Sequence, residues 1–172
     1  IAERCGIASL VVHGRTRACM YQGDAEYDSI RAIKQAVSMP VVANGDISCP
    51  HKAKAVLDYT GCDALMIGRG AQGRPWLPGQ VAHFLATGEL LPDPPLALQQ
   101  QLMVEHVAEL HRFYGDVLGP RIARKHVGWY LAGEAHRDFR AQLNGEDNAT
   151  QQLRLLAGYF IQRQQLAKAG AR

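Results

Sequence analysis

Hydrophobic and polar positions follow one pattern in the first half of the chain and another in the second. In the first half, short apolar runs are each followed by a polar loop that contains glycine, and then by a segment with helical spacing of its apolar residues. This alternation of strand, loop and helix predicts parallel βαβ units. The predicted strands are 8–12, 40–43 and 64–67, and the helices between them are 29–37 and 52–59.

The run Ala64–Ile67 predicts a strand buried on both faces, because an uninterrupted apolar stretch is typical of a parallel sheet. It leads into Gly68-Arg69-Gly70, where the glycines allow a sharp bend and Arg69 adds a charge that suits a phosphate. The alternative is an ordinary strand-to-helix turn with a solvated arginine. Comparable loops begin at His13 and Asn44, directly after the two earlier strands. Because parallel sheets bind ligands at this end of their strands, three such loops favour a ligand site.

The second half of the chain shows only helical spacing. A proline-rich stretch, 92–95, separates the two patterns, because three prolines in four positions cannot continue a helix. We therefore predict an α/β region over 1–91, a linker over 92–95 and an all-α bundle over 96–172. Within the bundle, helices are predicted around 103–114, 120–131, 134–143 and 153–160.

Composition is that of an ordinary soluble protein, with 172 residues, 47% apolar and 20% charged. No apolar run approaches about 18 residues, so no membrane span is predicted. The four cysteines have neither CxxC nor metal-site spacing, which predicts free thiols in the reducing cytoplasm and no metal. We expect Cys5 and Cys62 to be small buried residues, and Cys19 and Cys49 to lie in loops.

The net charge of +3 comes from the second half of the chain, where one predicted helix is strongly basic. Arg121, Arg124 and Lys125 share one arc of that helix, close to Trp129 and Tyr130. Basic side chains contact phosphate backbones and aromatic rings stack on unpaired bases, which predicts RNA binding. The alternative is a solvated charged face, with at least one of the two aromatic rings in the core.

Four segments occur in an order and spacing that resemble the tRNA-dihydrouridine synthases, and the bacterial B type most closely. They are His13–Arg17, Val42–Ile47, Ile67–Trp76, and Arg124–His126 with Trp129 and Tyr130. The resemblance implies an FMN-binding (β/α)₈ barrel of the TIM type followed by a helical domain that docks tRNA. The α/β region would then be the last three βα units of the barrel. Its open sheet edges lead us to expect self-association.

The resemblance also implies functional residues on the matching segments. Backbone N–H groups of two glycine loops and Arg69 suit the FMN phosphate, while Asn44 and Asp46 suit ribityl hydroxyls. The implied FMN contacts are His13, Asn44, Gly45, Asp46, Gly68 and Arg69. The implied tRNA contacts are Arg121, Arg124, Lys125 and His126.

The activity that the resemblance implies is reduction of uridine to 5,6-dihydrouridine in tRNA. NADPH reduces FMN, which passes a hydride to C6 while an acid protonates C5. The family's catalytic cysteine would lie upstream of Ile1, so we assign no catalytic residue here and expect the isolated chain to be inactive. Two alternatives stay open: a sugar-phosphate isomerase or lyase using the same phosphate site, and an RNA-binding module without catalysis.

Overall fold

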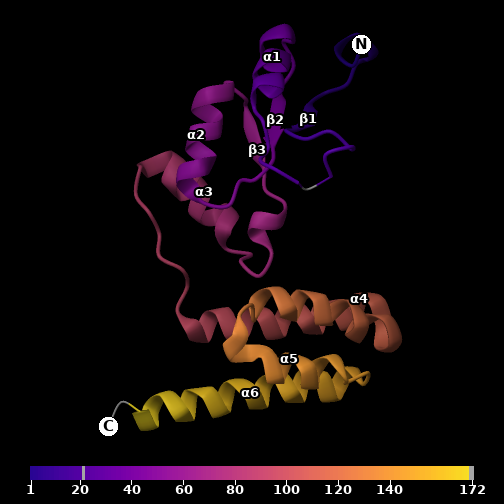
Figure 1. Cartoon of the computed structure of the whole chain (residues 1–172), viewed down its shortest axis with the longest axis vertical. Helices are drawn as coiled ribbons and strands as arrows, with labels where there is room; N and C mark the ends of the chain where they lie inside the picture. The colour runs from indigo at the N-terminus through magenta and orange to yellow at the C-terminus, as the bar shows by residue number, and fades with distance from the viewer. Residues whose placement is uncertain (21, 171–172) are drawn as a thin grey trace. The chain divides into compact units, whose positions relative to one another are not determined.

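The computed structural model describes residues 1–20 and 22–170, with side chains up to residue 163. The chain forms two compact units, Ile1–Asp93 and Pro94–Arg172. The first contains η1 (Glu3–Cys5), β1 (Leu10–His13), α1 (Asp28–Ala36), β2 (Val41–Asn44), α2 (Pro50–Thr60), β3 (Ala64–Met66), η2 (Arg69–Ala71) and α3 (Leu77–Thr87) (Figure 1). The second contains α4 (Leu96–Tyr130), η3 (Glu134–His136), α5 (Arg137–Asn144) and α6 (Ala149–Gly170).

The three strands of the first unit form one parallel sheet in the order β1-β2-β3. The predicted βα alternation is therefore confirmed, followed by a helical unit. The register aligns His13 with Asn44, and Asn44 with Met66, in one row across the carboxyl ends of the strands. Since side chains at one level of a sheet point to the same face, this row presents three side chains together.

The two faces of the sheet have different surroundings. On one face Val41 and Ala43 are fully buried under the helices, in a core that also contains Ile30 of α1, Val56 of α2 and Leu77 of α3. The opposite face carries the row that begins at His13, and it stays partly exposed. The helices thus hold the sheet from one side and leave the other side free for a ligand.

The expected burial of the third strand on both faces is wrong. Ala64 and Met66 are exposed and Leu65 is half-buried. The reason is position, because β3 pairs with β2 on one side and β2 is the central strand. A continuous apolar run does not distinguish a central strand from one at the edge.

The second unit is a helical bundle in which α4 is broken at Gly115 (φ 76°, ψ 176°). The halves pack closely, because a Cβ at Gly119 would lie 2.7 Å from the Cα of His111. The sequence predicts a new helix from Pro120, but the helix resumes directly after Gly115 and Pro120 lies inside it. No described helix has the length and apolarity to span a membrane. The core consists of Met103, Val107, Ala123, Val127, Leu131, Phe139, Leu143, Leu156 and Phe160.

A fully buried glutamine crosses this core. The side-chain oxygen of Gln152 accepts a hydrogen bond from His111 Nε2 at 2.8 Å. Its nitrogen donates to the carbonyls of Pro120 at 3.3 Å and Glu146 at 3.4 Å. One side chain of α6 is therefore tied to both halves of α4 and to the loop before α6.

Candidate functional site

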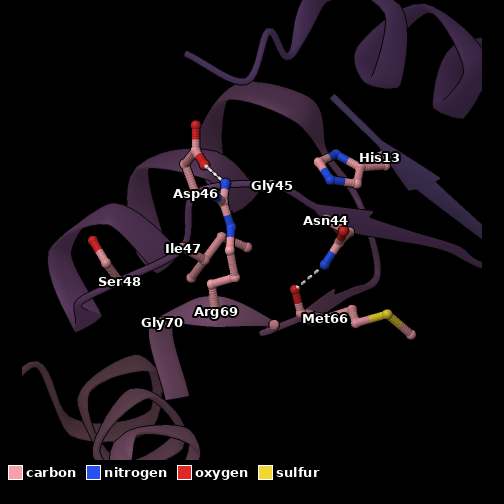
Figure 2. Close-up of a pocket in the computed structure, with 10 residues that line it drawn as sticks. His13, Asn44, Gly45, Asp46, Ile47, Ser48, Met66, Arg69 and Gly70 are labelled. Atoms are coloured by element: carbon pink, nitrogen blue, oxygen red, sulfur yellow. Dashed lines mark hydrogen bonds and ion pairs between the residues drawn. The ribbon is translucent and has the colours of Figure 1, made fainter. Parts of the chain in front are cut away.

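A cavity of about 520 Å³ opens at the carboxyl ends of the three strands. The row of side chains described above forms one wall, and the loops after β2 and β3 form the rest (Figure 2). All six residues predicted as cofactor contacts line it. The lining residues are His13, Asn44, Gly45, Asp46, Ile47, Ser48, Met66, Gly68, Arg69 and Gly70.

Asp46 is the most constrained side chain of the cavity. Its carboxylate accepts two hydrogen bonds from Arg15, at 2.8 and 2.5 Å, one from the backbone N–H of Ala25 at 2.7 Å, and one from Arg69 at 3.2 Å. Arg15 is 5% exposed, whereas Arg69 is 49% exposed. The hydrogen bonds from Arg15 are the main reason that the pKa of Asp46 falls to about 2. The carboxylate is therefore ionised and shared by an inner and an outer guanidinium.

Two glycines allow the loops to approach each other. Gly45 has φ 137°, and a Cβ there would lie 2.7 Å from the Cβ of Ala25. At Gly70 a Cβ would lie 2.2 Å from the carbonyl oxygen of Ile47, which brings the loop after β3 against the loop after β2. Side chains at these positions would force the backbone apart. The cavity wall therefore depends on close backbone contact.

Asn44 and Tyr27 fix the geometry of the loop after β2. The amide nitrogen of Asn44 donates to the carbonyl of Met66 at 2.7 Å, as Figure 2 shows, and this leaves the amide oxygen as an acceptor in the cavity. The hydroxyl of Tyr27 donates to the carbonyl of Gly45 at 2.7 Å. The cavity thus offers an acceptor at Asn44 and a cation at Arg69.

The basic segment of α4 carries a cluster of rings. The ring of His126 packs edge-on against those of His106 and Trp129, with centroids 4.8 Å apart in both pairs. Lys125 Nζ lies 5.1 Å from the centroid of the Trp129 ring. Burial is the main cause that lowers the pKa of His126, and the charges of His106 and Lys125 lower it further. Trp129 and Tyr130 are both half-buried, and Tyr130 packs against the core of the unit.

Arg124 has partners that its neighbours on the basic helix do not share. Its guanidinium donates to Asp147 at 2.5 Å and to the carbonyl of Glu146 at 3.1 Å, and the side chain is 26% exposed. Arg121 and Lys125 are exposed. Arg124 therefore holds the loop between α5 and α6, while the other two cations face solvent.

The cysteines differ in part from expectation. Cys62 is buried as predicted, but Cys5 is exposed in the short helix η1. Cys49 precedes α2, and its sulfur accepts a hydrogen bond from the backbone N–H of Lys52. The Thr16 hydroxyl, 3.0 Å from the sulfur, lowers the pKa of Cys19, which does not line the cavity. Within the described residues no cluster of three or more His, Cys, Asp or Glu side chains could hold a metal.

The pattern of the dihydrouridine synthase family (Dus) matches residues 1–165. The chain belongs to the dihydrouridine synthase family. The tRNA-dihydrouridine synthase B of Escherichia coli (strain K12) is 61% identical over 161 residues, which are 93% of this chain and 50% of that protein. The Serratia marcescens protein of the same name is 60% identical over 161 residues, 93% of this chain and 48% of its own length.

These relatives confirm the resemblance to the bacterial B type of dihydrouridine synthase. The chain spans about half the length of the curated relatives it matches. Four cavity residues are not among the six predicted cofactor contacts: Ile47, Ser48, Met66 and Gly70. Ile47 and Gly70 lie within the quoted motifs, and Ser48 and Met66 directly adjoin them; Met66 is also aligned with Asn44 in the register of the sheet.

Proposed function

We propose that this chain supplies the FMN-phosphate site and a tRNA-docking surface of an NADPH-dependent enzyme that reduces uridine to 5,6-dihydrouridine in tRNA. In this proposal the first unit is the last part of a TIM-type barrel, and the protein acts in the cytoplasm. The observation that carries the proposal is the meeting of six family-motif residues in one cavity. The names of the relatives support the reaction.

The residues of the cavity fit the phosphate end of FMN. A Cβ at Gly68 would meet no atom within 4 Å, so a ligand can approach this backbone closely. Arg69 supplies a cation beside it. Together with Arg15 and Asp46 it forms a group with one net positive charge, which attracts an anion. The same observations suit a sugar phosphate, and flavin binding separates the two functions.

FMN, when bound, supplies the hydride that reduces the C5–C6 double bond of uridine. The residues of this chain bind and orient it: Arg69 and the backbone of Gly68 hold the phosphate, and the Asn44 amide oxygen accepts from a hydroxyl. His13, at the end of β1, lies along the same wall. We assign no proton donor to this chain.

The experiment that tests the activity places this chain in a whole enzyme. The matching 161 residues of the Escherichia coli enzyme are replaced by this chain, and the hybrid is expressed in cells without other dihydrouridine synthases. We expect a yellow protein and tRNA heavier by two hydrogens per modified uridine, measured by mass spectrometry. A folded hybrid that bound no flavin would contradict the proposal. The control is the same hybrid with Arg31→Ala, which alters an exposed residue of α1 and should bind flavin and modify tRNA as the unaltered hybrid does.

A further inference from the structure

The carboxylate of Asp46 has no acceptor capacity left for a ligand. An ionised carboxylate accepts about four hydrogen bonds, two at each oxygen. Oδ1 accepts from Arg15 and Arg69, and Oδ2 accepts from Arg15 and the backbone N–H of Ala25. Both oxygens are therefore fully used. The expectation that this side chain binds a ribityl hydroxyl does not fit its surroundings.

The four donors come from three different parts of the first unit. Arg15 follows β1, Ala25 precedes α1, and Arg69 follows β3. Arg15 also donates to the carbonyls of the adjacent residues Gln22 and Gly23, so its guanidinium is held by backbone oxygens as well as by Asp46. An Asp46 side chain held by a nearly buried arginine is a fixed acceptor for the half-exposed guanidinium of Arg69.

We infer that Asp46 is a positioning residue, which turns the Arg69 guanidinium toward the phosphate end of the ligand instead of contacting the ligand itself. The inference rests on the proposed function, because it takes the ligand to be a flavin with a phosphate. Asp46, acting through Arg69, would then make the chain bind FMN more tightly than unphosphorylated riboflavin.

Asparagine is the appropriate replacement for Asp46. The backbone of Asp46 has φ 46°, in the left-handed region, and asparagine adopts this conformation as readily as aspartate. The amide oxygen accepts about two hydrogen bonds instead of four, and it carries no charge. Two of the four contacts are therefore lost. With the amide oxygen in the place of Oδ2, it keeps the hydrogen bonds from Arg15 and Ala25, and the contact with Arg69, the longest of the four at 3.2 Å, is among those released.

The experiment compares the binding of FMN and of riboflavin to the full chain by quenching of flavin fluorescence. We expect Asp46→Asn to weaken FMN binding about tenfold, as for loss of one orienting interaction with a charged group, and to change riboflavin binding less than about twofold. Arg69→Ala is expected to lower the FMN preference as well. In the double variant the preference should fall no further than in Arg69→Ala, since both changes remove one interaction.

The possible results distinguish failure of the inference about Asp46 from failure of the proposed function. Equal loss of FMN and riboflavin in Asp46→Asn would mean that Asp46 only stabilises the loops, and would overturn the inference alone. Unchanged binding of both flavins would overturn it too. If the unaltered chain bound neither flavin, the proposed function would fail and the inference with it.

A second measurement needs no substitution, in case Asp46→Asn does not fold. A crystal structure of the unaltered chain with FMN is expected to keep all four donors on the Asp46 carboxylate, with Arg69 also on the phosphate. A ribityl oxygen within about 3.2 Å of that carboxylate, in place of one of the four donors, would overturn the inference.

Discussion

The two units hold their exposed cations in opposite ways. In the cavity, Arg69 is oriented by a carboxylate that Arg15 and a backbone N–H fix in place. On α4, Lys125 lies over the Trp129 ring and Arg121 is exposed. A small anion in a fixed place is bound best by a cation already in position, because little side-chain entropy is then lost.

A nucleic-acid backbone makes different demands on its partner. It presents many similar charges, so mobile cations that displace counterions are sufficient, and aromatic rings add stacking. Arg124 is an exception to this difference between the units, because it lies on the basic helix but is held in place by Asp147. We therefore expect substitution of the oriented cation Arg69 and substitution of the exposed cations Arg121 and Lys125 to have different effects.

Loss of the oriented cation should have the largest effect. Arg69→Ala is expected to weaken FMN binding between about tenfold and a hundredfold, because a charge-assisted interaction with the phosphate is removed. Flavin fluorescence titration measures it, and Arg31→Ala should bind FMN as the unaltered chain does. Unchanged FMN affinity in Arg69→Ala would place the phosphate elsewhere.

Loss of the exposed cations of α4 should affect RNA binding and its dependence on salt. Arg121→Ala with Lys125→Ala is expected to weaken tRNA binding about tenfold and to reduce the logarithmic salt slope by nearly two. The control is Arg112→Ala with Arg137→Ala, which removes equal charge from two exposed arginines paired with Glu109 and Glu134. Filter binding at several salt concentrations measures both pairs. Equal losses would indicate only a general effect of net charge.

Arg124 is expected to behave as a structural residue. Arg124→Ala should lower the free energy of unfolding by about 1–2 kcal/mol, because it removes hydrogen bonds to Asp147 and to the Glu146 carbonyl. Lys125→Ala should change it by less than about 0.5 kcal/mol. Denaturant unfolding followed by circular dichroism compares the two. A loss of tRNA affinity in folded Arg124→Ala as large as in Lys125→Ala would remove the distinction.

A change of similar size is expected in the dependence of stability on acid. The pKa of Asp46 is about 2 in the folded chain and near 3.8 ordinarily, so its contribution is complete above about pH 4. That contribution is lost as the pH falls toward 2. Because the side chain is 27% exposed, we expect a loss of only about 1–2 kcal/mol. Unfolding measured from pH 5 to about pH 2 should show a smaller decline in Asp46→Asn.

The sequence is sufficient to predict the features that local pattern determines. The βα alternation follows from short motifs, and the six cavity residues were implied by the family resemblance of those motifs; they meet because strand ends in a parallel sheet lie at one edge. Pairings across long separations were not predictable. Tyr27 meets Gly45 and Arg124 meets Asp147 only after the chain has folded.

The exposure of some apolar residues could not be predicted from local pattern either. The strand Ala64–Met66 has the composition of a buried strand, yet it lies at the edge of the described sheet. Cys5 is apolar enough for a core but lies in an exposed turn of helix. In both cases burial depends on which neighbours the fold provides, and no window of sequence contains that information.

The buried amide of Gln152 determines the alignment of α6 in the bundle. A shift of α6 by one turn would place this side chain among apolar residues and leave His111 and two carbonyls without their hydrogen bonds. Apolar packing alone tolerates several alignments, whereas a single buried polar group tolerates one. Replacing Gln152 with leucine should therefore allow α6 to pack in the bundle in several alignments instead of one. The alignment of α6 against both halves of α4 therefore depends in part on this one amide.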